Sequence, residues 1–187
     1  MDLILASASP RRRDILRQIG IDGYAVQSPH IDETPYADEL GRPYAVRMAR
    51  EKSMAVHMPD ATCILTADTV VCTRRRILPK AQDAISAKDC ISYLAGRRHT
   101  VYTAMCFRTP THTHTKVIKT VVQMKNLDQG EIKDYVRHGD WHAKAGGYAI
   151  QGYASRYISH IGGSHSAVVG LDAYTVYKWL RQYGIIR

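Results

Sequence analysis

No part of this sequence approaches the roughly 20 consecutive apolar residues that a membrane-spanning helix requires. The first ten residues, MDLILASASP, contain only a short apolar run, and positive charges follow that run, whereas a secretory signal places them before it. These two absences argue against a membrane protein and against a secreted one. We expect a protein of the cytoplasm.

Low-complexity segments, tandem repeats and a collagen-like period are also missing. Of the 187 residues, 45% are apolar and 23% are charged, which is the balance of an ordinary globular protein. A chain of this length can bury a substantial core. We expect residues 1–187 to form a single domain.

Cysteines are few, and their spacing does not favour a metal site. The four cysteines, at positions 63, 72, 90 and 106, each stand alone in a strand-like or helix-like segment, without a CxxC pair. Reduced thiols in the core are therefore favoured over a zinc site or a disulfide. GxSxG, Walker and HExxH patterns are absent as well, which removes those signatures of nucleophilic, phosphate-binding and zinc chemistry.

Acidic residues are fewer than basic ones. The sequence has 26 lysines and arginines against 17 acidic residues, a formal net charge of +9, which favours a polyanionic partner such as a nucleic acid or a phosphorylated small molecule. The basic residues come in twos and threes without a basic tail, and an aromatic stacking motif of the RNP type is missing. We therefore expect a focused anion site and no nucleic-acid partner.

Strand-like and helix-like segments alternate at both ends of the chain, with a strand-rich middle. This pattern predicts an α/β protein with a mixed, curved sheet flanked by helices and a cleft at the strand ends. Strands are expected at 2–6, 24–29, 61–71, 76–79, 98–109 and 113–124, and the Gly-rich segment 144–163 is also strand-like. Helices are expected at 10–19, 43–58, 83–95, 128–138 and 171–183.

The first expected helix begins with an unusual concentration of positive charge. Ser9 is a candidate N-cap and Pro10 a typical first helical residue, yet Arg11, Arg12 and Arg13 fill the first turn, where the helix dipole disfavours cations. A strand followed at once by a helix N-terminus presents free amides to a ligand, and arginines beside them make a site for phosphate. The alternative is a solvated basic turn.

Acidic residues stand at two places where charge needs an explanation. Asp68 interrupts the apolar run ILTADTVV, and a carboxylate there must be paired, bound to metal or placed at a strand end facing a cleft. An aspartate that caps a turn is the alternative. Asp32 and Glu33 form an acidic pair in a loop, more often solvated than metal-binding, although carboxylates beside a phosphate site suit magnesium.

Three further residues carry weaker signals. Lys52 and Lys80 are single lysines that, taken alone, are more often on the surface. In KAGGYAIQG, the glycine pair permits close approach of the backbone, and Gln151 has both a donor and an acceptor for a base edge. A Gly-rich turn without a ligand is an equally good interpretation.

Taken in order, these segments resemble the Maf family of nucleoside triphosphate pyrophosphatases. The matching segments span nearly the whole chain and are LASASPRRRDIL, IDET, YAVRMAREKS, TADTVV, ILPKAQDAISA, KAGGYAIQG and GGSHSAVVGL. The resemblance implies hydrolysis of a nucleoside triphosphate between the α and β phosphates, assisted by a divalent cation such as Mg²⁺ or Mn²⁺. It also implies a homodimer.

The resemblance assigns roles residue by residue. Asp68 falls at the position of the catalytic carboxylate, described as proton acceptor and metal partner, with Glu33 as a second metal residue. Positions around the phosphates and metal are those of Ser7, Arg11, Arg12, Glu33, Lys52 and Lys80, and positions linked to substrate choice are those of Arg11, Thr69 and Gln151.

Thr69 and Gln151 resemble the branch of the family that acts on dTTP and UTP, whereas the 7-methyl-GTP branch tends to have glutamine after the aspartate. That other branch is one alternative. Another is a nucleic-acid-binding protein that regulates septum formation, with which the family has been associated. The sequence departs from the family pattern at Arg74 to Arg76, Ala81, His165 and Asp172.

Overall fold

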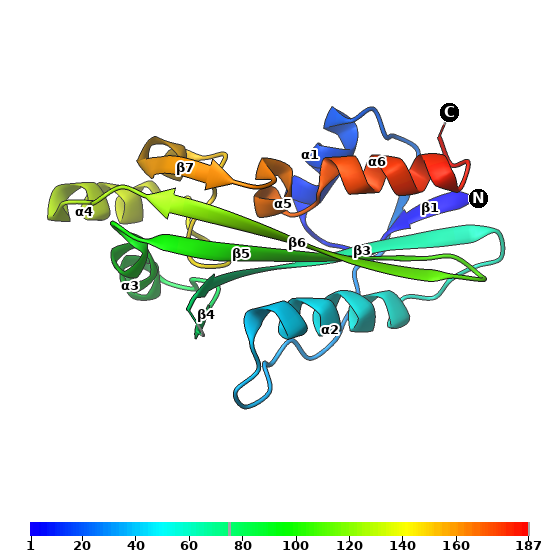
Figure 1. Ribbon diagram of the computed structural model, residues 1–187, viewed down its shortest axis with the longest axis horizontal. Coiled ribbons are helices and arrows are strands. Elements are labelled where there is room, and N and C mark those ends of the chain that lie inside the picture. Colours follow the sequence, from blue (N-terminus) through cyan, green and yellow to red (C-terminus); the bar gives the residue numbers. More distant parts are fainter. Residues whose placement is uncertain (75, 187) are drawn as a thin grey trace.

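The computed structural model describes residues 1–74 and 76–186. In this part of the chain a seven-stranded sheet has the order β2, β1, β3, β5, β6, β7, with β4 also paired to β3 (Figure 1). The strands are β1 (Asp2–Leu5), β2 (Ala25–Val26), β3 (Thr62–Thr73), β4 (Arg76–Leu78), β5 (Arg98–Arg108), β6 (Thr113–Met124) and β7 (Ile158–Gly162). β1 runs parallel to β2 and β3, and all other pairs are antiparallel, which confirms the predicted mixed sheet.

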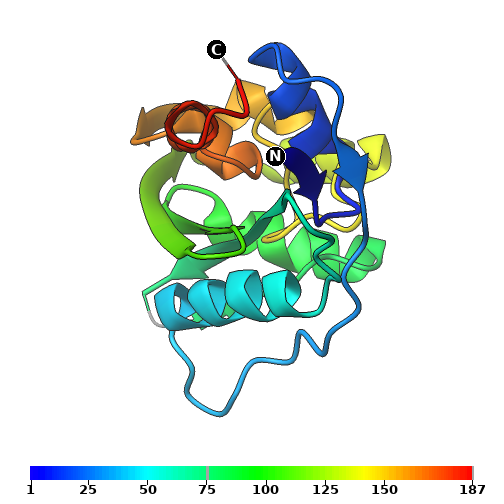
Figure 2. The ribbon, with the colours of Figure 1, turned by 90° about the vertical axis from the view of Figure 1, so that its right-hand side faces the viewer.

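Helices cover both faces of this sheet. They are α1 (Pro10–Gln18), α2 (Gly41–Met54), α3 (Ala84–Leu94), α4 (Gln129–His138), α5 (His165–Val169) and α6 (Ala173–Gln182), with a 3₁₀ helix η1 (Tyr153–Tyr157). Figures 1 and 2 show α2 lying across one face, and α1 and α6 on the other. Within the described residues, no helix has both the length and the apolar character needed to cross a membrane.

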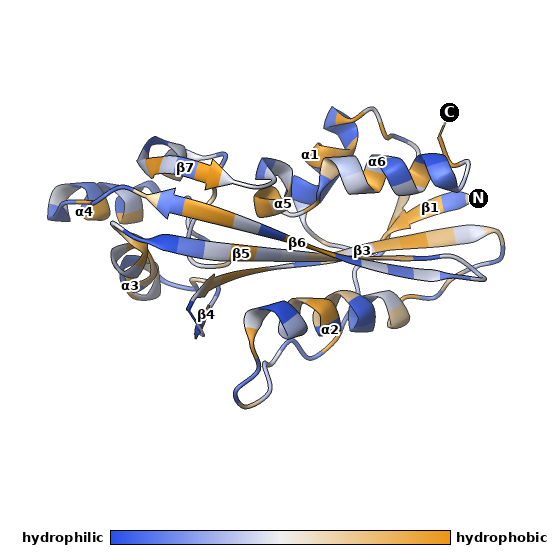
Figure 3. Cartoon of the chain, in the orientation of Figure 1, coloured by the Kyte–Doolittle hydropathy of each residue, from blue (hydrophilic) through white to orange (hydrophobic). Residues whose placement is uncertain are grey.

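β3 is the central strand, and both of its faces are buried. Cys63, Leu65 and Ala67 belong to the core between the sheet and helices α1 and α6, whereas Val70 and Cys72 pack with α2. A strand covered on both sides has a continuous apolar sequence. Figure 3 accordingly shows β1 and the first part of β3 as hydrophobic ribbons.

One edge of β3 has a gap, and this gap positions the site. β5 pairs along one edge of β3, while the other edge is shared by β1, which pairs with residues 62–65, and β4, which pairs with residues 71–73. Between them, residues 66–70 have no strand partner on that edge within the part that the structure describes. Asp68 and Thr69 lie in this gap, and as neighbours in a strand they point to opposite faces of the sheet.

All four cysteines are free and buried, as predicted for core thiols. Burial raises the pKa of Cys63 and of Cys72 to about 11, so these thiols stay protonated at neutral pH. Protonated buried thiols act as small apolar side chains in packing.

The bounds of α2 differ from the prediction at both ends. The helix begins at Gly41, two residues before Pro43, and ends at Met54 rather than at Met58. Proline lacks only an amide hydrogen that the first turn does not use, so Pro43 fits inside that turn. The helical spacing of residues 43–58 predicts that Tyr44, Met48 and Ala55 lie near one face. For Ala55 this was wrong, because the helix stops before it and Ala55 is exposed.

The prediction of strand for the whole segment 144–163 was also wrong. Only residues 158–162 form a strand, and residues before it form turns and η1. Gly146 and Gly147 have φ of 64° and 67°, which no strand residue adopts. A Cβ on Gly146 would lie 2.8 Å from Val71, so only glycine fits there.

The amphipathic pattern of the last helix predicts that residues 174, 176, 177 and 180 are available for packing, and in α6 this holds for two of the four. Val176 and Leu180 are buried, but Tyr174 and Tyr177 are 72% and 41% exposed. The helical period places positions 176, 179 and 180 on the inner face, where Trp179 stacks on Phe107. The apolar pattern identified the helix correctly, but it misplaced the two tyrosines.

Candidate functional site

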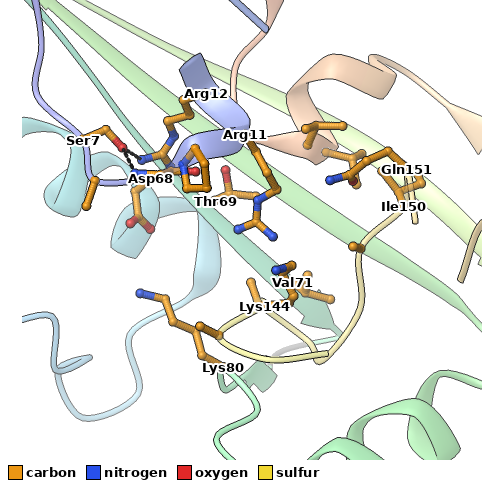
Figure 4. Close-up of a pocket in the computed structure, with 18 of the residues that line it drawn as sticks. Ser7, Arg11, Arg12, Asp68, Thr69, Val71, Lys80, Lys144, Ile150 and Gln151 are labelled. Carbon is orange, nitrogen blue, oxygen red and sulfur yellow. Dashed lines mark hydrogen bonds between the residues drawn. The ribbon is translucent and has the colours of Figure 1, made fainter. Parts of the chain in front are cut away.

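A pocket of about 520 Å³ opens at the gap in the edge of β3 (Figure 4). Its walls come from the turn after β1, the start of α1, α2, β3, and the segment around residues 143–151. All nine residues selected from the sequence line it, namely Ser7, Arg11, Arg12, Glu33, Lys52, Asp68, Thr69, Lys80 and Gln151. The fold therefore brings together positions that are spread over most of the chain.

The turn before α1 is built around Ser7 and Arg12. Arg12 donates from Nη1 to Ser7 Oγ at 2.8 Å and from Nε to the carbonyl of Gly170 at 3.0 Å. Burial lowers the pKa of Arg12, although the nearby Asp68 carboxylate opposes this effect. The guanidinium remains charged at neutral pH. Ser9 has the extended backbone of an N-cap, but its side chain accepts no capping hydrogen bond. Its amide donates to Ser7 Oγ at 3.2 Å.

Arg11 is held differently from Arg12. Its Nε is buried and has no hydrogen-bond partner among the described residues. Figure 4 shows its guanidinium extending into the pocket. Arg13 is exposed, as expected for the surface member of the three. A buried donor without a partner costs free energy unless a ligand supplies an acceptor, so the structure favours the anion site over the solvated basic turn.

Asp68 is paired, which explains a carboxylate inside an apolar strand. The Lys52 Nζ lies 2.6 Å from Asp68 Oδ1 and 2.8 Å from Glu33 Oε1. Lys80 Nζ lies 2.7 Å from Glu33 Oε2. Asp68 and Lys52 are each only 6% exposed, so Lys52 is not the surface residue that its local sequence favoured.

Glu33 is brought into the pocket by contacts between its loop and α2. The hydroxyl of Tyr44 donates to the backbone carbonyl of Glu33 at 2.7 Å, and Arg47 donates to the carbonyl of Thr34 at 3.1 Å. Partial burial raises the pKa of Glu33, but hydrogen bonds from Lys52 and Lys80 outweigh it and lower the value to about 2. Glu33 is therefore ionised at neutral pH.

Asp32 does not join the pocket. It is exposed and accepts hydrogen bonds from the amide and hydroxyl of Thr34, at 2.9 and 2.6 Å. These bonds stabilise a turn of the kind that aspartate commonly forms. The acidic pair of the sequence therefore divides into a structural residue, Asp32, and a pocket residue, Glu33.

The donor set of the pocket suits a hard divalent cation. Within the described residues, no group of three or more histidine, cysteine and acidic side chains is arranged to hold a metal. Glu33 and Asp68 nevertheless both contact one ammonium group, that of Lys52, so a single cation can reach both carboxylates. Magnesium is commonly held by one or two carboxylates together with substrate phosphates. Asp68 and Glu33 are thus the residues that would hold it.

Thr69 and Gln151 also line the pocket, and Figure 4 shows Gln151 at the end far from Asp68. The Thr69 hydroxyl lies 3.1 Å from that of Thr103, its partner across β3 and β5. A second hollow of about 690 Å³ adjoins this end, and Arg11 and Gln151 line both spaces. The pocket therefore extends from the carboxylate of Asp68 to Gln151 and the adjoining hollow.

Lys144 also lines the pocket and was not selected from the sequence. Backbone pairing places it near Lys80, because the Ala81 amide donates to the Lys144 carbonyl at 3.3 Å and Lys80 bridges to Ala145. Burial lowers the pKa of Lys144, and the positive charge of Arg11 lowers it further. The signal that points to it is a lysine two residues before a glycine pair that folds back on the pocket.

The departures from the family pattern lie mostly outside the pocket. Asp172 caps α6, accepting from the Thr175 amide at 3.0 Å and from the Ser164 hydroxyl at 2.6 Å. Ala81 follows Lys80, and Lys80 lines the pocket. His165 lines the adjoining hollow. Arg74 and Arg76 flank the turn between β3 and β4, and Arg75 lies outside the described residues.

A buried histidine supports the pocket loop from behind. His99 is 2% exposed, and its Nε2 lies 2.7 Å from the hydroxyl of Tyr148, which belongs to the pocket wall. The other ring nitrogen, Nδ1, has no partner among the described residues. Burial lowers the pKa of His99 from 6.5 to about 4.

This shift predicts a pH dependence of stability. Between pH 6.5 and 4 the unfolded chain binds a proton at His99 that the folded protein does not bind, so the free energy of unfolding falls as pH falls through this range, by roughly 3 kcal/mol in total. Urea unfolding at several pH values measures it. His99→Gln should flatten the slope in this window, while an unchanged slope would contradict the assignment. Glu33 adds its own loss only below about pH 4.5.

Comparison with known proteins shows the family of this chain. The model of the family described as Maf-like protein matches residues 2–183. The chain belongs to the Maf family. A relative from Novosphingobium aromaticivorans named dTTP/UTP pyrophosphatase is 44% identical over 98% of this chain and 92% of its own. A relative of the same name from Zymomonas mobilis is 48% identical over 97% of this chain and 91% of its own.

Other relatives of this Maf protein have a broader name. A nucleoside triphosphate pyrophosphatase from Ehrlichia chaffeensis is 44% identical over 97% of this chain and 96% of its own. A solved nucleoside-triphosphatase / dITP/XTP pyrophosphatase from Mycobacterium abscessus matches with 16% identity and a TM-score of 0.42, over 74% of this chain and 94% of that one. The family assignment depends on the full-length relatives and the family model.

Proposed function

We propose that this Maf protein hydrolyses dTTP and UTP between the α and β phosphates, releasing a nucleoside monophosphate and pyrophosphate. The observation that carries the proposal is the pocket in which Arg11, Arg12, Lys52 and Lys80 surround the carboxylates of Asp68 and Glu33. Relatives named dTTP/UTP pyrophosphatase support the choice of substrate.

The arginines and lysines of the pocket bind the phosphates and offset their negative charge. Bringing a nucleophile to a triphosphate is costly because like charges approach, and fixed cations offset the charge that builds on the phosphate oxygens in the transition state. Arg11, with its unpaired buried Nε, and Arg12, held by Ser7, have planar groups that bind phosphate oxygens in pairs. This arrangement also explains arginines at a helix N-terminus, since the substrate supplies the missing negative charge.

Asp68 orients and deprotonates the attacking water. Its Oδ1 is bound by Lys52, so Oδ2, which has no partner among the described residues, is the atom that accepts a hydrogen bond from water and then its proton. Mg²⁺ or Mn²⁺, held by Asp68 and Glu33, would supply charge neutralisation and a lower pKa for that water. Lys52 donates to Oδ1 at 2.6 Å and so fixes the orientation of the Asp68 carboxylate for either role.

The remaining pocket residues serve the nucleoside. Arg11, Thr69 and Gln151 all line the pocket, and Arg11 and Gln151 also line the adjoining hollow. Gln151 has both a donor and an acceptor for the edge of a base. Threonine after the aspartate favours the dTTP and UTP branch over the 7-methyl-GTP branch. A homodimer and a cytoplasmic location stay predictions.

The decisive test is pyrophosphate release from dTTP, UTP, CTP and 7-methyl-GTP with Mg²⁺ or Mn²⁺. We expect selective turnover of dTTP and UTP. Cleavage of 7-methyl-GTP alone would overturn the substrate assignment and leave the reaction class standing. A well-folded protein that cleaves none of them, yet binds single-stranded DNA or RNA with a steep salt dependence, would overturn the enzyme proposal in favour of nucleic-acid binding.

A further inference from the structure

Behind the pocket wall, Thr103 links Thr69 to the backbone of α5. Thr103 is fully buried on β5 and stands opposite Thr69 in the register of β3 and β5. Its hydroxyl lies 2.6 Å from the carbonyl oxygen of Ala167 and 3.1 Å from the hydroxyl of Thr69. These three groups form a short chain that leads from the core to the pocket.

The direction of the hydrogen bonds in this chain follows from counting protons. A carbonyl oxygen only accepts, so Thr103 donates its single hydroxyl proton to Ala167. Thr103 therefore has no proton left for Thr69, and in the bond between the two hydroxyls Thr69 is the donor. The proton of Thr69 thus points away from the pocket, and the oxygen presents lone pairs to a ligand.

We propose that Thr103 is a positioning residue for base selection. Because Thr103 accepts the hydrogen bond that Thr69 donates, Thr69 can only accept a hydrogen bond from a ligand. This inference rests on the proposed function, in which Thr69 faces the nucleoside. Figure 4 shows Thr69 in the same pocket wall as Arg11 and Gln151. The group selected is the imide N3–H shared by thymine and uracil.

The chemistry of the bases explains why this device separates them. Thymine and uracil carry a proton on N3, which an acceptor oxygen binds. Cytosine has a lone pair at N3, which an oxygen with no available proton repels. With cytosine in the site, the acceptor oxygen and N3 are both left without a hydrogen-bond partner. This lowers the affinity for the wrong substrate strongly, because water cannot reach the buried groups to replace the missing bond. The chain from Ala167 to Thr69 therefore favours dTTP and UTP over CTP.

The test measures kcat/KM for UTP and CTP in Thr103 variants. Thr103→Val and Thr103→Ala remove the donor to Ala167 and the acceptor for Thr69, so the Thr69 proton becomes free to face the pocket. We expect the ratio of kcat/KM for UTP to that for CTP to fall by about tenfold or more. Thr103→Ser keeps the hydroxyl and should retain the wild-type ratio.

Thr120→Val is the matched control. Thr120 is also a fully buried strand threonine, and its hydroxyl bonds to the backbone of Ser164, at 3.1 Å from the amide and 3.3 Å from the carbonyl. It makes no hydrogen bond to Thr69. Loss of a buried hydroxyl should lower the stability of Thr120→Val and Thr103→Val alike. The ratio of kcat/KM for UTP to that for CTP should stay at the wild-type value in Thr120→Val.

A second measurement uses the wild-type protein and needs no variant. UTP methylated at N3 lacks the proton that Thr69 accepts, so its kcat/KM should be at least tenfold below that of UTP. Equal kcat/KM for UTP and N3-methylated UTP would overturn the inference. So would an unchanged ratio of kcat/KM for UTP to that for CTP in folded Thr103→Val or Thr103→Ala. In either case, pyrophosphate release from UTP by the wild type would still support the proposed function. Failure of the wild type to release pyrophosphate from UTP at all would overturn both.

Discussion

Asp68→Asn is expected to lower kcat for pyrophosphate release from dTTP by about 10²- to 10⁴-fold, the range typical of removing a general base. An amide oxygen still accepts a hydrogen bond from Lys52, but the amide cannot take a proton from water at neutral pH. It is also a poorer partner for a divalent cation than a carboxylate. Initial rates with dTTP and Mg²⁺ measure the effect.

The fold should survive this substitution. Lys52 keeps Glu33 as an ionic partner at 2.8 Å, so its buried charge is not left alone. Circular dichroism and the melting temperature check this point. Asp134→Asn, which changes an exposed aspartate of α4 that pairs only with Arg137, is the matched control and should leave the rate unchanged. Near-normal hydrolysis by a folded Asp68→Asn protein would contradict the assignment of Asp68.

Lys52→Met should impair both turnover and stability. The substitution leaves the Asp68 carboxylate buried and without its ionic partner, and breaking a buried ion pair from one side costs roughly 3 kcal/mol or more. It also removes a cation that faces the phosphates, so kcat/KM for dTTP should fall by at least tenfold. Thermal unfolding and initial rates measure the two effects.

The same variant separates the role of Lys52 from that of the metal. In the wild type, the Lys52 ammonium lies between the two carboxylates, where a divalent cation competes with it. Mn²⁺ without nucleotide should therefore raise the melting temperature of Lys52→Met more than that of the wild type, because binding to the folded state stabilises it. Lys133→Met, at an exposed position of α4, should behave as the wild type does. An equal Mn²⁺ shift in all three proteins would show that Lys52 does not occupy the cation position.

Local patterns located most elements because each depends on interactions between neighbours in the chain. The capping box from Asp83 to Ser86 begins α3, and Gly139 ends α4 with a φ of 83°, both as the residue types predict. The run ATCILTADTVV, continuous in apolar and β-branched residues, is typical of a strand covered on both sides, and the two cores around β3 confirm that interpretation. The errors lie where tertiary contacts override local preference, as at Gly146 against Val71 and at the outer tyrosines of α6.

The residues of the site could be selected from the sequence, but the contacts between them and their burial could not be predicted. Residue types alone suggested an anion site at the arginines, and the family resemblance added Glu33, Lys52 and Lys80. Neither indicated that Lys52 is buried between two carboxylates, or that Asp32 turns away from its neighbour Glu33. Such facts depend on how α2 lies against β3, which brings together groups far apart in the chain.

The sequence by itself determined the types of most strands and helices, the buried character of β3 and the arginines of one anion site, since hydrophobic periodicity and residue chemistry are local properties. Only the tertiary structure decided which charges pair, which donors stay free and which way the Thr69 proton points. The gap between β1 and β4 leaves part of the β3 edge open, and at that gap alternation sends Asp68 toward Lys52 and Thr69 toward Thr103. Long-range backbone pairing creates that gap, and no local pattern in the sequence encodes it.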